Sequence, residues 1–214
     1  MDETALLEAL APERRLALAY APRRARADWL AVLALDARLG AVIVHAREPL
    51  IGQVRLAWWR ERFGEDPGRW PTGEPLLAAL RGWGAELPAL AALVDAWEAL
   101  LADAPRPAQV FAELGDARAE VLGALAGRLG QGGAVGPLRA AARQWSRADL
   151  LCRLTDPAER SAVEQLAQPV ESPRLPRAMR PLAVLVTLAG RTARRGEARP
   201  GDLLAALRIG LFGR

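Results

Sequence analysis

The sequence has no lysine and no asparagine, and it has only one histidine (His45), one cysteine (Cys152) and one tyrosine (Tyr20). Without lysine there is neither a P-loop lysine nor a lysine Schiff base. A single cysteine and a single histidine exclude a disulfide within the chain and a zinc site built from several such residues. A Ser-His-acid triad would depend on His45, and no G-x-S-x-G turn is present to hold its serine.

All 29 basic residues are arginine, and the 25 acidic residues leave a net charge of +4. Acids and arginines are interleaved along most of the chain, as is typical of solvated helix faces. We therefore expect no nucleic-acid partner. Two arginine clusters leave open an alternative, a helical module that binds nucleic acid or anionic lipid. The clusters consist of Arg14, Arg15, Arg23, Arg24 and Arg26, and of Arg191, Arg194, Arg195 and Arg199.

The longest apolar stretch, residues 29–44, is interrupted by Asp36 and Arg38. It therefore falls short of the roughly 18 apolar residues that a membrane span requires. Acidic residues near the N-terminus, Asp2, Glu3 and Glu8, stand where a signal peptide would be positively charged. These features predict a cytoplasmic protein, whose contact with a membrane would be peripheral, at the inner membrane.

Alanine and leucine dominate the chain, and proline or glycine interrupts it at intervals that suit helices. No lasting apolar/polar alternation indicates a strand. The sequence predicts an all-α protein with one domain over residues 1–214. Helices are expected at 3–10, 12–19, 23–46, 48–63, 75–83, 88–103, 107–130, 135–155, 157–167, 176–195 and 200–212.

The expected helix at 23–46 is apolar on nearly every side, so it belongs in the centre of a bundle. One of its stripes places Asp36 between Val32 and Leu39, and a stripe of the next helix places Arg55 between Gly52 and Trp59. A lone buried charge costs several kcal/mol, so each of these charges needs a partner. We predict that Asp36 and Arg55 lie in the same interior region and pair, and we favour a structural ion pair over a ligand-binding role.

Residues 16–63 contain two motifs. A Tyr-Ala-Pro-Arg turn at 20–23 opens the long apolar helix, and the following segment reads Arg-Glu-Pro-Leu-x-Gly-Gln at 47–53 and Arg-Leu-x-Trp-Trp-Arg-Glu at 55–61. This region resembles the N-terminal part of the squalene/phytoene synthase family. It is most similar to short, divergent bacterial members that resemble the mitochondrial complex I assembly factor of that family. The resemblance implies a helical bundle of the isoprenoid synthase type.

The resemblance also implies a metal site. In active members of this family, Asp-rich motifs on two facing helices hold Mg²⁺ ions that bind the substrate diphosphates. The first motif would fall at 35–44, where Asp36 is the only acid. The second would fall at 145–156, where Asp149 and Asp156 are seven residues apart and Leu154 stands where an aspartate is expected. We therefore expect no metal site and no cofactor, with Mg²⁺ needed only if the chain is an active enzyme.

The favoured function is a non-catalytic binding or assembly factor, whose partner is a membrane-complex subunit or an isoprenoid or lipid held in a remnant pocket. One alternative is a head-to-head prenyltransferase of isoprenoid biosynthesis with an atypical site, in which Asp36, Asp149 and Asp156 converge from distant helices. The arginine-rich module described above is the other alternative. The candidates for the pocket are Asp36, Arg55, Trp59, Arg60, Asp149 and Arg153.

For most of the other residues that stand out in the sequence, we expect structural roles. Trp58 and Trp59 suit core packing, His45 suits the surface at a helix end, and Cys152 suits a buried position. Helical spacing also aligns Arg153 with Arg139, Arg143 and Ser146, which favours a solvent-facing basic stripe. Asp116 and Glu120 are expected on a solvated face.

Overall fold

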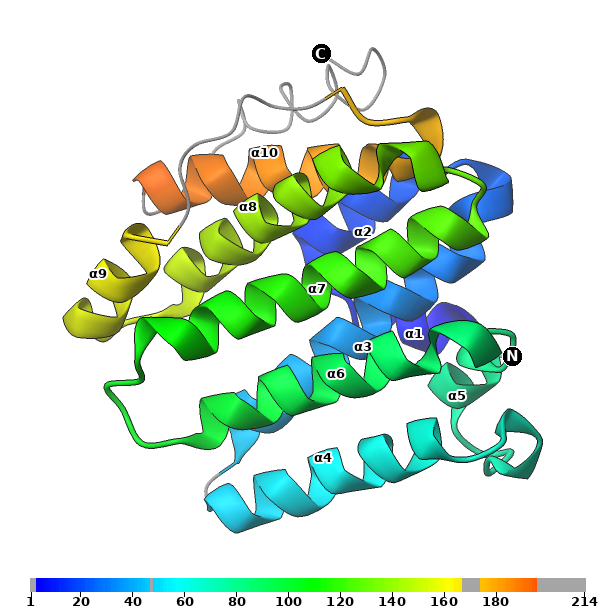
Figure 1. Cartoon of the computed structure of the whole chain (residues 1–214), viewed down its shortest axis with the longest axis horizontal. Coiled ribbons are helices and arrows are strands. Elements are labelled where there is room, and N and C mark those ends of the chain that lie inside the picture. The colour runs from blue at the N-terminus through cyan, green and yellow to red at the C-terminus, as the bar shows by residue number, and fades with distance from the viewer. Residues whose placement is uncertain (1–2, 47, 167–173, 196–214) are drawn as a thin grey trace.

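The computed structural model describes residues 3–46, 48–166 and 174–195, and within these ranges it contains ten α-helices and no strand (Figure 1). The predicted all-α class is thereby confirmed. The expected helix at 200–212 lies outside the described residues. The α-helices are α1 Glu3–Glu8, α2 Pro12–Ala19, α3 Arg26–His45, α4 Pro49–Gly64, α5 Pro75–Leu80, α6 Leu87–Glu98, α7 Ala108–Arg128, α8 Val135–Arg153, α9 Pro157–Glu164 and α10 Arg180–Arg195.

Prolines mark where many of the helices begin. Seven helices have a proline among their first three residues, where the missing N–H leaves no intrahelical bond unmade; they are α2, α4, α5, α6, α8, α9 and α10. Asp156 caps α9, because its Oδ1 accepts hydrogen bonds from the backbone N–H groups of Ala158 and Glu159. Two expected helices, 88–103 and 135–155, were too long. The first ends as an α-helix at Glu98 and continues as a 3₁₀ turn. The second ends at Arg153, because the backbone of Leu154 is extended.

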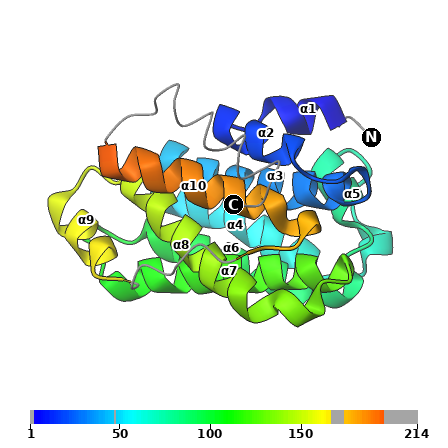
Figure 2. The same ribbon diagram turned by 90° about the horizontal axis from the view of Figure 1, so that it is seen from above.

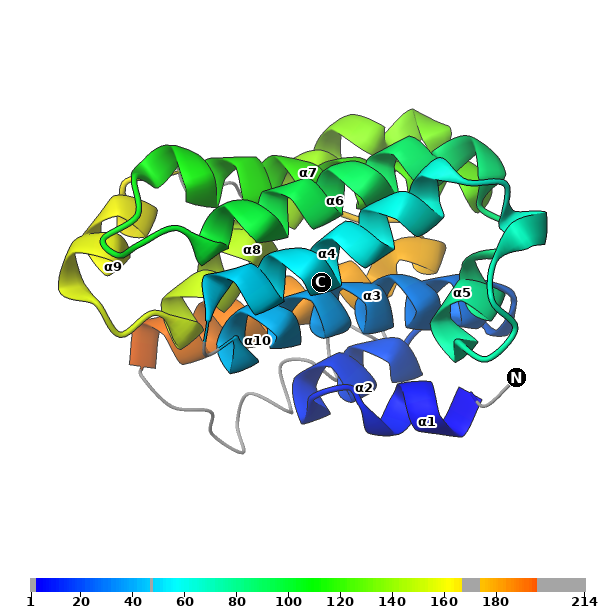
Figure 3. The same cartoon turned by 90° about the horizontal axis from the view of Figure 1, so that it is seen from below.

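Five helices form a row in which each packs on the next, in the order α4, α6, α7, α8 and α10, from bottom to top in Figure 1. The helix α3 crosses behind this row, and α1 and α2 lie on its far side, as the views from above and below show (Figures 2 and 3). The predicted central position of α3 is confirmed, since ten of its 20 residues are buried.

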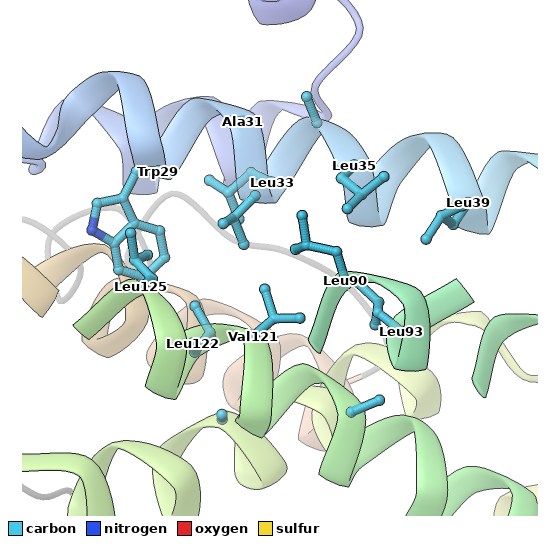
Figure 4. Packing of buried hydrophobic residues seen from close by; sticks show 14 of the residues in the cluster. Trp29, Ala31, Leu33, Leu35, Leu39, Leu90, Leu93, Val121, Leu122 and Leu125 are labelled. Carbon is cyan, nitrogen blue, oxygen red and sulfur yellow. The ribbon is translucent and has the colours of Figure 1, made fainter. Parts of the chain in front are cut away.

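The core forms where α3 meets the row. Leucines of α3 face Leu90 and Leu93 of α6, and Trp29 lies near Leu125 of α7 (Figure 4). The Nε1 of Trp29 donates to the backbone oxygen of Ala178 at 2.8 Å, which ties the start of α3 to the segment before α10. The buried apolar residues form one continuous cluster from Leu6 in α1 to Leu188 in α10.

Gly40 of α3 lies against the indole of Trp97 in α6. A Cβ at this position would lie 3.0 Å from Cη2 of Trp97, which is closer than a well-packed core allows. We predict that Gly40→Ala lowers the free energy of unfolding, because a strain of roughly 1–3 kcal/mol outweighs a gain in helix propensity of about 1 kcal/mol.

Gly127 in α7 provides the matched control, because a Cβ there has no heavy atom within 4 Å. Gly127→Ala is expected to stabilise the protein by roughly 0.5–1 kcal/mol. Urea unfolding followed by far-UV circular dichroism measures both effects. Equal stabilisation by the two substitutions would contradict the tight packing at Gly40.

Candidate functional site

Four charged side chains from four helices meet inside the bundle. They form what we call the central cluster, consisting of Arg14 from α2, Asp36 from α3, Arg118 from α7 and Asp149 from α8, each at most 8% exposed. Nε and Nη2 of Arg118 donate to the two oxygens of Asp36 at 2.8 and 2.9 Å, and Nη2 also donates to Oδ2 of Asp149 at 3.0 Å. Nη2 of Arg14 donates to Oδ2 of Asp36 at 2.7 Å.

Neighbouring groups satisfy the rest of the cluster. The guanidinium of Arg118 lies between the indoles of Trp97 and Trp145, at 5.1 and 4.7 Å from the ring centroids. Nε1 of Trp97 donates to Oδ1 of Asp36 at 3.1 Å, and Nη1 of Arg118 donates to Oγ of Ser146 at 3.0 Å. Paired charges, hydrogen bonds and stacked rings together make the burial of these ions tolerable.

The cluster keeps its members charged. Burial by itself would raise the pKa of Asp36, but the guanidiniums of Arg118 and Arg14 outweigh it and hold that pKa well below its usual range. The pKa of Asp149 is lowered in the same way, with Arg153 adding to the effect. Burial opposes the charge of Arg118, yet Asp36 and Asp149 raise its pKa. Two carboxylates and two guanidiniums therefore balance, and neither acid is poised to exchange a proton near neutral pH.

The donor set of the central cluster does not suit Mg²⁺. The ion takes oxygen ligands in near-octahedral geometry, whereas the oxygens of Asp36 and Oδ2 of Asp149 already accept bonds from guanidiniums. Two fixed positive charges also lie where a cation would enter between the acids. Within the ranges that the structure describes, no three His, Cys, Asp or Glu side chains gather as metal ligands would.

The predicted pairing of Asp36 with Arg55 is wrong. The buried stripe of α4 consists of Gly52, Leu56, Trp59 and Phe63, and Arg55 is exposed. Helical spacing allows either residue 55 or residue 56 to lie on the inner stripe, and packing against α6 selects Leu56. The prediction that Asp36 lies in an apolar row and has a buried partner is confirmed, but its partners come from α2 and α7.

Arg55 and Trp59 line an open groove of about 560 Å³ between α3 and α4, which we call the α3–α4 groove. Its walls are mostly apolar, and Trp58 and Trp59 meet edge to face with centroids 4.9 Å apart. At one end Arg38 lies 3.7 Å from Glu74. The lining residues are Arg38, Ala41, Val42, His45, Val54, Arg55, Trp58, Trp59 and Glu74.

The six candidate residues therefore fall in three places. Asp36 and Asp149 belong to the central cluster, and Nη2 of Arg153 joins its edge by donating to Oδ1 of Asp149 at 3.1 Å. Arg55 and Trp59 line the groove. Arg60 belongs to neither place, since it pairs with Asp95 and Glu98 of α6 and fastens α4 to that helix.

Of the predictions for α8, one is confirmed in part and one is wrong. Arg143 and Arg153 are exposed and Arg139 is half-buried, as the predicted basic stripe requires, but Ser146 is buried beside Arg118 and does not belong to it. At the surface, Arg139 pairs with Glu120 and Arg143 with Asp116. Cys152 is exposed, because Leu150 and Leu151 occupy the inner side of the last turn. The solvated positions expected for Asp116 and Glu120 are confirmed.

The expected positions of the tryptophans and of His45 agree with the structure. Trp59 is buried as expected, Trp58 is half-buried, and His45 is exposed at the end of α3. Trp59 packs against neighbouring rings, and its ring centroid lies 5.8 Å from that of Phe63.

The sequence interpretation did not identify Arg14 and Arg118. A signal for Arg118 existed, because apolar residues at helical spacing enclose it in α7, among them Leu114, Val121 and Leu125. This is the same pattern that singled out Asp36. Arg14 was assigned to an exposed arginine cluster, yet it is buried and adds nothing to the basic surface.

In comparisons with known proteins, no protein-family model matches the chain, and no curated protein or solved structure is significantly similar to it. None of the helices in the described ranges is both long and apolar enough to cross a membrane.

Proposed function

We propose that this chain is a non-catalytic protein of the squalene/phytoene synthase type, with the corresponding isoprenoid synthase bundle, and that it acts by binding. In this proposal it is an assembly factor whose partner is a subunit of a membrane complex. The α3–α4 groove takes the role of the remnant pocket and accepts an isoprenoid or lipid chain. No cofactor is required.

The central cluster is the observation that supports this proposal. Ionising an allylic diphosphate requires cations that take up the negative charge of the leaving group. Asp36 and Asp149, the acids nearest to the expected motifs, each bond to Arg118 instead. An arginine cannot bridge several diphosphate oxygens and a carboxylate as Mg²⁺ does. Carboxylates that would bind a metal ion in a synthase here form ion pairs that connect four helices.

The groove supports a binding role independently of the cluster. Its volume of about 560 Å³ lies within the roughly 300–1,000 Å³ of small-molecule sites. Indole rings and valines provide apolar contact, and Arg55, which is exposed, would meet an anionic head group, whereas Arg38 pairs with Glu74. An apolar chain with a charged end suits this lining.

A turnover assay tests the absence of catalysis. The purified protein is incubated with farnesyl diphosphate or geranylgeranyl diphosphate and Mg²⁺, and prenyl products are extracted and quantified. We expect no product above the level of a protein-free blank. Product that forms with the wild type and with Asp116→Asn, a surface control, but disappears with Asp149→Asn would overturn the proposal.

One observation favours the alternative of an active prenyltransferase. Asp36 and Asp149 come from different helices, α3 and α8, and meet around one guanidinium. The third acid that this alternative requires, Asp156, caps α9 through its side chain and bonds to neither of them. The turnover assay above distinguishes the two proposals.

A further inference from the structure

The large apolar side chains that the described surface exposes lie together at one corner of the molecule. We call this region the α3–α4 corner and define it by four residues from the end of α3 and the first turns of α4. Their exposed fractions are 71% for Val44, 67% for Leu50, 45% for Ile51 and 64% for Val54. Scattered exposed leucines or valines would need no explanation, but a contiguous group indicates a contact surface.

The helix α4 lies along the edge of the molecule. It forms the lower border in Figure 1 and faces the viewer in Figure 3. One side of α4 packs against α6 and α3 through Leu56, Trp59 and Phe63. Leu50 and Val54, one helical turn apart, are exposed, and Val54 lies at the α3–α4 groove. The apolar corner therefore projects from the rim of the bundle and is not enclosed by it.

Residues near the corner match a helix that lies at a membrane–water interface. Arg55 is exposed, and among the described residues no hydrogen bond or ion pair engages it. Trp58 is half-buried one turn further along, with the guanidinium of Arg62 at 5.7 Å from its ring centroid. Exposed aliphatic residues, a tryptophan and arginines that reach toward phosphates are typical of interfacial helices. Acidic residues also lie here: Glu48 directly precedes α4, and Arg62 pairs with Glu61 and Glu65. Of these two arginines, Arg55 is the one that is available to contact a phosphate.

The four partly exposed aliphatic side chains present on the order of 400 Å² of apolar surface. A second copy of the chain would have to add a similar area of matching polar surface to reach the roughly 800 Å² that a stable interface buries on each partner. A bilayer needs no matching surface, since a few aliphatic side chains enter the acyl region while an arginine such as Arg55 remains at the phosphates.

We infer that the α3–α4 corner docks on a phospholipid bilayer. Val44, Leu50, Ile51 and Val54 insert below the head groups, and Arg55 contacts a lipid phosphate. This inference rests on the proposed binding role and names the surface that carries it. The α3–α4 groove, to which Val54 also belongs, then opens toward the bilayer.

Co-sedimentation of the full chain with vesicles tests the inference. Vesicles of phosphatidylcholine with a minor share of phosphatidylglycerol are expected to pellet the wild type. Leu50→Asp and Val54→Asp should each weaken this binding by about tenfold or more, because a charge must be moved into the acyl region. Both side chains are exposed, so neither substitution disturbs the core. Arg55→Glu should weaken binding to these vesicles more than to pure phosphatidylcholine.

The matched control is Ala85→Asp, which places the same charge on an exposed residue between α5 and α6, at the end of the molecule far from the corner (Figure 1). It should bind as the wild type does. Failure of the wild type to bind, or equal binding by Leu50→Asp, would overturn the inference. So would a wild-type dimer that Leu50→Asp converts to a monomer in analytical ultracentrifugation without vesicles. Prenyltransferase turnover would overturn the proposed function and leave the vesicle result unaffected.

Discussion

Asp36→Asn is expected to lower the free energy of unfolding by roughly 3–5 kcal/mol, the usual cost of breaking a buried ion pair. The amide keeps the shape of the side chain but removes its charge, which leaves Arg14 and Arg118 facing one buried carboxylate, Asp149. Trp97 also loses a charged acceptor for its N–H group. Chemical denaturation followed by tryptophan fluorescence and by circular dichroism measures the effect.

Asp116→Asn is the control for this substitution. Asp116 pairs with Arg143 at the surface, where an ion pair contributes about 1 kcal/mol or less. If Asp36→Asn does not fold, Trp97→Phe provides a milder variant, because it removes one hydrogen bond to Asp36 and leaves all four charges in place. We expect a loss of roughly 1–3 kcal/mol for this variant. A loss at Asp36 no greater than that at Asp116 would show that the cluster is not a major source of stability.

Acidification is expected to destabilise the protein through the same carboxylates. In the folded protein the pKa values of Asp36 and Asp149 lie below their ordinary value of 3.8. The stabilisation that they provide is therefore complete above about pH 4 and is lost as the pH falls below that value toward the folded pKa. A single carboxyl group of this kind contributes on the order of 2–3 kcal/mol. Urea unfolding midpoints at about pH 7, 5 and 3 should be similar for the first two conditions and clearly lower for the third.

Asp149→Asn tests where this acid sensitivity originates. The variant is less stable than the wild type at neutral pH, but it loses less stability on acidification because one of the titrating groups is gone. Glu159 keeps a share of the sensitivity in every variant, since hydrogen bonds from Arg106 lower its pKa. Asp116→Asn should retain the wild-type dependence. An unchanged dependence in Asp149→Asn would place the acid sensitivity elsewhere in the protein.

The helical class, most helix starts and the central place of α3 follow from the order of residues alone. Each is a local property. A proline in the first turn favours a helix start wherever the helix later packs, because the N–H that it lacks would have no intrahelical acceptor there. A segment as apolar as residues 29–44 is unstable at the surface and is therefore buried. For the same reason the burial of Asp36, and its need for a partner, were predictable.

The identity of that partner depended on how the helices are rotated about their axes. Arg55 and Leu56 are adjacent in α4, and spacing permits either on the inner stripe. Contact with α6 turns Leu56 inward and leaves Arg55 in the groove. Arg14 and Arg118 lie 22 and 82 positions from Asp36 along the chain, beyond the reach of any periodic pattern. Which charges meet, and which aliphatic side chains remain exposed at the α3–α4 corner, are outcomes of packing between distant segments, because burial of a whole helix face outweighs the preference of any single residue.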